Sequence, residues 1–131
     1  MADLKVGVLG KEEMTVTEKD TAKVYGSGDL EVFGTPAMIA LMEKTALNSI
    51  VPFLEEGEGS VGTKLDIRHV AATPVGMKVR CESELVGVDR RRLTFTVKAY
   101  DEAGLIGEGE HERFVISSER FMAKAAERGK A

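Results

Sequence analysis

The chain lacks three features that mark several large classes of protein: a set of cysteines, an excess of positive charge and long hydrophobic runs. Its 131 residues include one cysteine, Cys81, so no internal disulfide can form. A lone cysteine suits a reducing compartment, because disulfides are rare in the cytosol. The N-terminal residues MADLKVGVLGKEE contain no apolar segment of the signal-peptide type. We therefore expect a cytoplasmic protein.

The charge and the apolar runs also limit the partners. The formal net charge is −4, which gives the whole chain no electrostatic attraction to nucleic acid. The longest apolar run, PAMIALM, is too short to cross a bilayer. We therefore expect neither nucleic acid nor a membrane as partner.

The composition is that of one ordinary folded domain. Hydrophobic residues make up 43% of the chain and charged residues 31%, with no low-complexity tract. No internal repeat and no linker interrupts the sequence. We expect residues 1–131 to form a single domain.

One long helix is predicted over about residues 36–55. Thr35 has the residue type of an N-cap, and Pro36 suits the first helical position. Pro52 is expected to break or kink the last turn, and Gly57 to end the helix. The apolar residues of this segment recur on one side of the helix: Met38, Leu41, Met42, Ala46, Ile50 and Leu54.

The rest of the chain carries β-strand patterns. Two short β-like pieces, 6–9 and 14–16, precede the helix. The segments that follow the helix are predicted as four strands, 62–72, 77–89, 91–101 and 104–117, and a short helix, 118–129. This order predicts an α+β fold in which an antiparallel sheet wraps around one helix. The sheet then has an uncovered face and free edges, so we expect a dimer.

His69 lies where the strand pattern calls for an apolar residue. Leu65, Ile67 and His69 alternate along one strand and share one face. A lone histidine at such a position is often a core residue bonded to the backbone. Imidazole is also the natural general base near neutral pH, so the strand can deliver His69 into a pocket.

Two residues of the predicted helix are candidates for the same site. Glu43 interrupts the most apolar part of the helix, where it is either a surface residue or a group that orients His69 or holds a water. Thr35 is either a helix cap or a reactive hydroxyl. The start of the helix also offers free N–H groups to a developing oxyanion.

The last predicted strand carries a second histidine. Gly107, Gly109, His111 and Arg113 alternate on one face. The small residues leave space there, either as a pocket wall or for close packing against the helix. No metal-ligand spacing accompanies His111, so we predict no metal site.

Three further features of the sequence are interpreted mainly as structural rather than functional. Gly76 is expected in a turn. The arginines at 90–92 are typical of a solvated hairpin, although such a cluster can also hold a phosphate. Cys81 is expected in the core, because it shares one face of its predicted strand with Met77, Val79 and Leu85.

Together these residues resemble the fluoroacetyl-CoA thioesterase family, a branch of the hotdog-fold acyl-CoA thioesterases. The resemblance extends from about Phe33 to Ala125. It rests on FGT, ALMEKTALNSIVPFLEEGEGSVGT, HVAATPVG, RRLTFTVKAYD and IGEGEHERFVI followed by ERF. The spacing from Thr35 to Glu43 to His69 also fits the catalytic Thr/Glu/His set of that family.

The resemblance implies a hotdog fold, assembled as a homodimer or a dimer of dimers. It implies hydrolysis of an acyl-CoA thioester to free acid and CoA without metal or cofactor. Gly62 is then expected at the active site, where its backbone N–H helps to bind the thioester carbonyl. We also expect Phe33 and Arg113 to contact the substrate.

The helix imposes one constraint on this site. Eight residues of helix rise about 12 Å, so Thr35 and Glu43 cannot meet on one straight helix. Either the chain bends back before Thr35, or the two residues come from different protomers. We favour a site at the dimer interface.

Other functions remain compatible with the same pattern: a hotdog acyl-thioester hydratase or dehydratase, a non-catalytic acyl-CoA-binding protein, and a purely structural dimer. The lid region also differs from the fluoroacetyl-specific member of the family. The segment VYGSGDLEVF lacks its paired phenylalanines before Phe33, and Pro36 stands where that member has glycine. These differences argue against selectivity for a fluoroacetyl group.

Overall fold

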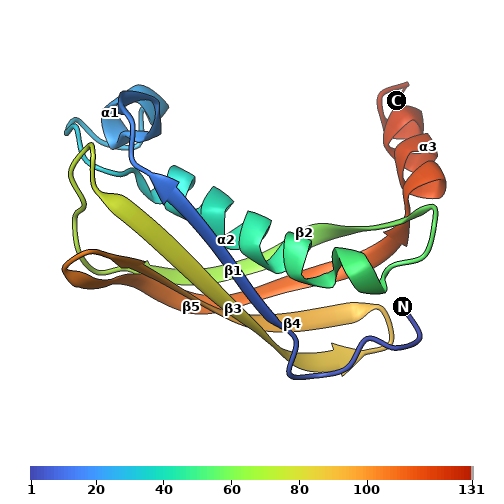
Figure 1. Ribbon diagram of the computed structural model, residues 1–131. Helices are drawn as coiled ribbons and strands as arrows, with labels where there is room; N and C mark the ends of the chain where they lie inside the picture. The colour runs from blue at the N-terminus through green and yellow to red at the C-terminus, as the bar shows by residue number, and fades with distance from the viewer. Residues whose placement is uncertain (131) are drawn as a thin grey trace.

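A long helix, α2 (Thr35–Ile50), lies across the inner face of a curved antiparallel sheet (Figure 1). The structure, a computed structural model, describes residues 1–130. The sheet has five strands in the order β1-β3-β4-β5-β2. Their bounds are β1 Leu9–Thr15, β2 Glu58–His69, β3 Lys78–Asp89, β4 Arg92–Asp101 and β5 Gly104–Ser117. The predicted sheet wrapped around one helix is confirmed.

The core lies between α2 and the middle strands. Over residues 78–85 of β3 and 92–99 of β4 the burial alternates, because one face of each strand packs on the helix. The strand residues in the core are Val79, Cys81, Leu85, Leu93, Phe95, Val97 and Ala99. The predicted apolar stripe of α2 meets them, with Met38, Leu41, Met42, Ala46 and Ile50 buried. Cys81 is a buried core residue, as expected.

The helix begins and ends earlier than the sequence pattern predicts. Gly34, not Thr35, is the N-cap, and no side chain caps the helix. The chain leaves α-helical geometry at Ile50 and continues as a 3₁₀ turn, η2, over Val51–Phe53. Pro52 accounts for this change, because its ring removes one N–H and clashes with the carbonyl four residues before it.

Three other boundaries differ. Strand β2 starts at Glu58 rather than Gly62 and ends at His69, where the chain leaves the sheet. Before α2 the chain forms a 3₁₀ turn, η1 (Glu18–Asp20), and a short helix, α1 (Ala22–Tyr25), that the sequence pattern does not predict. The two β-like N-terminal pieces overlap only the two ends of a single strand, β1, which also includes the residues between them.

The small residues of β5 serve close packing. A Cβ atom on Gly107 would lie 2.5 Å from the Met38 sulfur of α2, and one on Gly109 would overlap the backbone of β2 at Asp66. Helix and strand therefore occupy the space that these glycines leave. The alternative of a pocket wall at these two positions is not what the structure shows.

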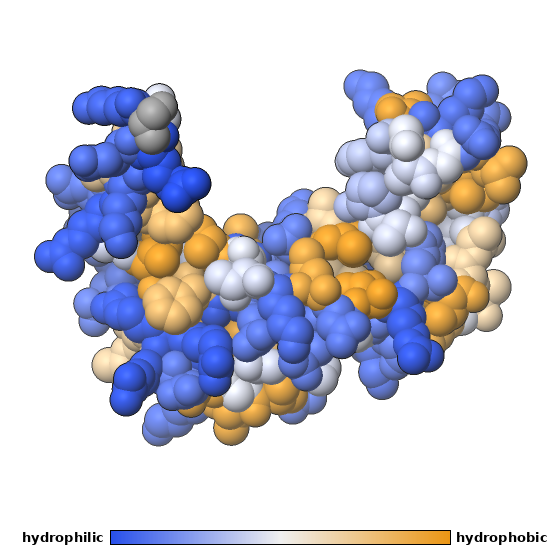
Figure 2. Space-filling model, turned by 180° about the vertical axis from the view of Figure 1, so that it is seen from behind, coloured by the Kyte–Doolittle hydropathy of each residue, from blue (hydrophilic) through white to orange (hydrophobic). Residues whose placement is uncertain are grey.

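The chain ends in α3 (Ser118–Arg128), which projects from the end of β5 at the opposite end of the sheet from α1 (Figure 1). None of its residues is buried. Seen from behind, α3 and the α1 region stand on either side of a broad concave surface with exposed hydrophobic patches (Figure 2). Within residues 1–130, no helix has the length and apolar character needed to span a membrane.

Candidate active site

Thr35 and His69 lie in direct contact at one end of the sheet. The Thr35 hydroxyl is 2.8 Å from His69 Nδ1. Thr35 comes from the first turn of α2 and His69 from the last position of β2, 34 residues later. The strand face that carries His69 thus brings its imidazole to the Thr35 hydroxyl. We call them the Thr35–His69 pair.

The unpredicted helix start explains why the hydroxyl is available. Because Gly34 is the N-cap, Thr35 is already a helical residue and its side chain accepts no bond from the helix N–H groups. The first helical bond runs from Met38 N–H to the Gly34 carbonyl. The N–H groups of Thr35 and Ala37 precede that bond, as in the first turn of any helix.

The surroundings of His69 favour the neutral imidazole. Burial lowers the pKa of His69, and the backbone of Ala71 opposes this effect. Nε2, the nitrogen turned away from Thr35, is buried and has no hydrogen-bond partner among residues 1–130. A neutral imidazole can accept a proton from the hydroxyl bonded to Nδ1.

A hollow of about 330 Å³ opens beside this pair. Phe33 is fully buried and lines it, together with Ala22 and Ser27 from the α1 region. The segment that differs from the phenylalanine-rich lid therefore forms one wall of this hollow. Phe33 is placed as a substrate-contacting residue would be, and its role stays a prediction.

Glu43 lies in a different cluster, farther along α2. Its Oε2 is 3.9 Å from Arg113 Nη1, and its side chain is 38% exposed. The backbone of Gly62 passes so close that an added Cβ would lie 2.6 Å from the same oxygen. Strand register explains this proximity, since Gly62 on β2 pairs with Arg113 on β5.

Arg113 is held rigidly behind Glu43. Its side chain is 6% exposed, and it donates from Nε to the Ser60 hydroxyl at 2.8 Å and from Nη2 to the Ser60 carbonyl at 2.9 Å. Burial lowers the pKa of Arg113, and the nearby Glu43 opposes this shift. The guanidinium therefore positions the Glu43 carboxylate, and direct contact of Arg113 with substrate stays a prediction.

His111 completes this second cluster. Its Nδ1 is 2.9 Å from the Lys64 carbonyl, which can only accept, so Nδ1 carries the proton. Nε2 is then free to accept from Arg113 Nη1 at 3.2 Å. Burial, first, and then the Arg113 charge lower the pKa of His111. We call Glu43, Gly62, Arg113, His111 and Ser60 the Glu43 cluster.

The sequence pattern did not identify Ser60 and His111 as members of the site. His111 was placed on the correct face, but its partners depend on the pairing of β2 with β5, which has a register shift between Gly62 and Lys64. A histidine between a glycine-rich stretch and an arginine was the available signal in the sequence. In residues 1–130, no group of three or more His, Cys, Asp or Glu side chains is placed to hold a metal ion.

The chain thus carries two separate parts of one predicted site. Thr35 and Glu43 stand eight residues apart on the same regular helix, about 12 Å along its axis. The chain does not bend back before Thr35, because Thr35 is itself in the helix. One protomer therefore brings Thr35 to His69, but Glu43 contacts Arg113 instead.

Comparisons with known proteins point to the same family. Residues 16–119 match the family model described as fluoroacetyl-CoA-specific thioesterase. A fluoroacetyl-CoA thioesterase from Streptantibioticus cattleyicolor is 46% identical over 98 residues, which cover 75% of this chain and 70% of that protein.

Solved structures agree with this match. A fluoroacetyl-CoA thioesterase structure superposes with a TM-score of 0.89 at 38% identity, covering 95% of this chain and 96% of the other. A thioesterase-superfamily protein from Thermus thermophilus gives 0.91 at 30% identity, covering 99% and 96%. A hot-dog-like protein from Thermanaerovibrio acidaminovorans gives 0.87 at 27%, covering 95% and 93%.

These similarities confirm both the hotdog fold and the predicted resemblance. The match covers both parts of the site, from the α1 region to the end of β5. The chain belongs to the fluoroacetyl-CoA-specific thioesterase family.

Proposed function

We propose that residues 1–131 form a single acyl-CoA thioesterase domain whose active site is completed by a second copy of the chain. Thr35 and His69 of one protomer and Glu43 of the other are its catalytic residues. The observation that carries this proposal is the 2.8 Å contact between Thr35 and His69 Nδ1, in a chain whose family members hydrolyse thioesters.

His69 acts as the general base. A hydroxyl within hydrogen-bond reach of a neutral imidazole is the geometry of an activated nucleophile. His69 takes the proton either from Thr35, which then attacks the thioester carbonyl, or from a water held by Thr35. In both cases the C–S bond breaks and the CoA thiolate leaves, taking a proton from the imidazolium or from water. The water route gives the free acid directly. On the Thr35 route the acyl group stays on the Thr35 oxygen as an ester, and a water activated by His69 then hydrolyses this ester to the free acid and restores the hydroxyl.

Two sets of N–H groups are available for the oxyanion of the tetrahedral intermediate. One is the first turn of α2, where no side chain caps the N–H groups. The other is the backbone of Gly62 beside Glu43. Gly62 comes within reach of the Thr35–His69 pair only if the partner protomer supplies it.

Edge strand β2 supports the two-copy arrangement. It is twelve residues long, and its outer edge has no strand partner among residues 1–130. It also exposes Leu65 at 41% and is followed by the exposed Val70. Long edges of this kind are normally covered, and a second copy of β2 covers both edges at once.

An antiparallel β2–β2 contact also completes the site. Across a twofold axis, the His69 end of one strand lies beside the Glu58 end of the other. The Thr35–His69 pair of one protomer then faces the Glu43 cluster of its partner. Glu43 is thereby placed to orient the imidazole or to hold the attacking water, and the exposed Thr35 becomes enclosed.

The cytoplasm is the proposed location. The single cysteine is buried, and burial raises the pKa of Cys81 to about 11, so its thiol stays unreactive in the core. Such a chain gains nothing from an oxidising compartment.

The acyl group is proposed to be other than fluoroacetyl. The wall that the α1 region contributes beside Thr35 uses small residues such as Ala22 and Ser27 rather than paired phenylalanines. A hollow with such a wall accepts a larger acyl chain than a tightly enclosed lid does.

The direct test is release of free thiol from a panel of short, branched and aromatic acyl-CoAs. We expect turnover by the wild type, and a loss of roughly 10²- to 10⁴-fold for His69→Ala, the usual contribution of a general base. Thr35→Ala should fall similarly, whereas Thr96→Ala, on the outer face of β4, should not. A folded wild type that releases no thiol from any member contradicts the proposal.

A further inference from the structure

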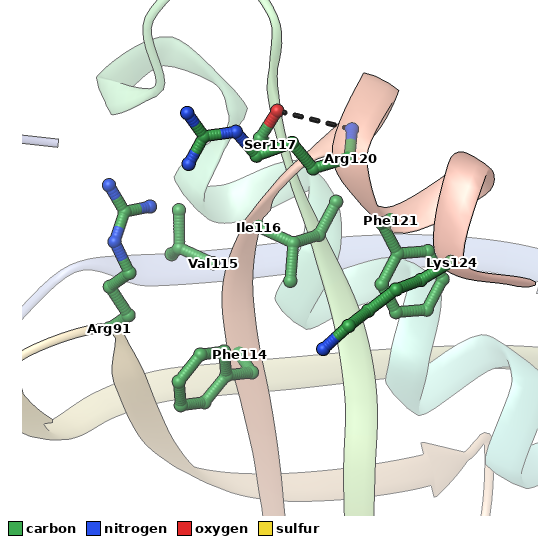
Figure 3. Close-up of a pocket in the computed structure, with 8 residues that line it drawn as sticks. All are labelled: Arg91, Phe114, Val115, Ile116, Ser117, Arg120, Phe121 and Lys124. Atoms are coloured by element: carbon green, nitrogen blue, oxygen red, sulfur yellow. Dashed lines mark hydrogen bonds between the residues drawn. The ribbon is translucent and has the colours of Figure 1, made fainter.

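A second hollow, of about 490 Å³, lies between the end of β5 and helix α3 (Figure 3). Its apolar lining includes Phe114 and Ile116 from β5 and Phe121 from α3. Three cations surround it: Arg91 from the β3–β4 turn, and Arg120 and Lys124 from α3. We call these six residues and the space between them the basic hollow.

Two of the three cations of the basic hollow, Arg120 and Lys124, have no partner in the described part of the chain that explains them. Figure 3 shows the guanidinium groups of Arg91 and Arg120 on one side, with Lys124 extending from α3 toward Phe114. Arg91 is 3.4 Å from Glu58. Within residues 1–130, Arg120 and Lys124 form no ion pair, and no carboxylate lines the hollow. Two cations without an acidic partner in that range, beside a third that pairs with Glu58 at the rim, favour an anionic ligand.

The apolar part of the hollow restricts the kind of anion. Phe114 and Phe121 are each 41% exposed beside the cations. Exposed aromatic side chains next to arginine are suited to stack a planar base, and the cations are suited to phosphate. A phosphorylated nucleotide combines both chemistries, whereas a free phosphate uses only one of them.

The basic hollow is also at a useful distance from the Glu43 cluster. On β2 and β5, the pair Gly62–Arg113 belongs to that cluster, and the pair Glu58–Ser117 lies at the rim of the hollow. Four residues of strand separate the two pairs, roughly 13 Å. This separation is comparable to the length of the pantetheine arm, which joins the sulfur of CoA to its pyrophosphate.

We propose that the basic hollow binds the adenosine 3′,5′-bisphosphate end of the CoA substrate. The inference rests on the proposed thioesterase function and adds the position of the nucleotide to it. Arg91, Arg120 and Lys124 hold the phosphates, and Phe114 and Phe121 contact the base. The pantetheine arm then runs along the 58–62 part of β2 toward Glu43. Gly59 has no side chain there, and that of Ser60 is small.

Calorimetric titration with adenosine 3′,5′-bisphosphate tests this site without any hydrolysis. We expect Arg120→Ala and Lys124→Ala each to weaken binding about tenfold, the scale of one lost charge-assisted contact. Arg128→Ala removes a like charge from the same helix outside the hollow, and should bind as the wild type does. Far-UV circular dichroism checks that α3 remains folded in each variant.

Kinetics with two thioesters of the same acyl group separate this proposal from the proposed function. With acyl-CoA, Lys124→Ala and Arg120→Ala should raise KM about tenfold and leave kcat unchanged. With the N-acetylcysteamine thioester, which lacks the nucleotide, both variants should match the wild type. If no thioester is hydrolysed but the titrations behave as expected, the nucleotide site stands and the thioesterase function falls.

Three results would overturn the nucleotide site. One is a wild type that does not bind the bisphosphate. Another is equal binding by the wild type and an Arg120→Ala/Lys124→Ala double variant. The third is binding of inorganic phosphate as tight as that of the bisphosphate, which would make the hollow a general anion site.

Discussion

At the scale of single residues, Gly62 controls where the Glu43 carboxylate lies. A methyl group at this position would come within 2.6 Å of Glu43 Oε2 and 3.2 Å of His111 Cε1. The carboxylate is the end of a flexible side chain, so it can swing away at little cost to folding. We therefore expect Gly62→Ala to reduce kcat/KM by about tenfold or more and to change stability less, by about 1 kcal/mol.

A double-mutant cycle identifies the cause of that loss. If Gly62→Ala acts by displacing Glu43, adding it to Glu43→Gln should reduce activity little further, because contacting residues are not additive. Fully additive losses in the double variant would show that Gly62 acts independently of Glu43.

The partly buried position of His69 predicts the pH dependence. Because burial lowers its pKa below the ordinary value of 6.5, His69 stays neutral to lower pH than a free imidazole. Activity that needs the neutral base is lost only as pH falls through this lowered pKa. We expect the acidic limb of the kcat/KM profile to have an apparent pKa below 6.5. A limb at or above that value contradicts a partly buried, neutral base.

The free energy of unfolding should also fall as the pH is lowered. His69 and His111 both have lowered pKa values in the folded chain, so the unfolded chain binds protons more readily. Their contribution to stability is complete above the unfolded pKa of 6.5 and declines as pH falls below it. Urea unfolding on either side of that pH checks this, with His111→Gln as the comparison.

Single residues also show what a sequence reveals and what it leaves out. His69 was recognisable because an imidazole broke an alternating strand. The bond between Thr35 and His69 was not, because residue preferences favour threonine over glycine as the N-cap. The contact of Glu43 with Arg113 joins residues 70 positions apart and depends on strand pairing.

At the scale of elements, the β2–β5 pair carries the Glu43 cluster and depends on Gly109. A Cβ there would collide with the β2 backbone at Asp66 and Ile67, which cannot swing away as a side chain can. We expect Gly109→Ala to lower the free energy of unfolding by about 1–3 kcal/mol, the usual cost of overpacking. Gly28→Ala, whose new methyl would meet only Ala22 at 3.4 Å, should be nearly neutral in urea unfolding.

The long elements were predictable because their patterns repeat several times. The alternation on β3 and β4 and the stripe on α2 each span at least two full repeats. The short pieces η1 and α1 have three and four residues, too few for a helical period to register. The strand β2 was predicted to start too late because its first residues include glycine, which is more typical of turns than of strands.

At the scale of the whole molecule, the sequence led us to expect a dimer but did not predict how two copies would meet. The free edge of β2 and the separation of Thr35 from Glu43 are both visible in a single copy of the chain. In the proposed dimer, the contact between copies depends on the shape of the folded surface, which is concave between α3 and the α1 region in Figure 2. Only the folded chain shows that surface.

Complementation between two inactive variants tests the shared site most directly. Thr35→Ala and Glu43→Ala are unfolded together, mixed in equal amounts and refolded, beside each variant treated alone. In a mixed dimer with shared sites, one site combines both substitutions and the other is entirely wild type. Since half of the dimers are mixed, we expect about a quarter of the wild-type thiol-release rate to return. If the mixture is no more active than either variant alone while size-exclusion chromatography shows dimers, Thr35 and Glu43 do not act across the interface.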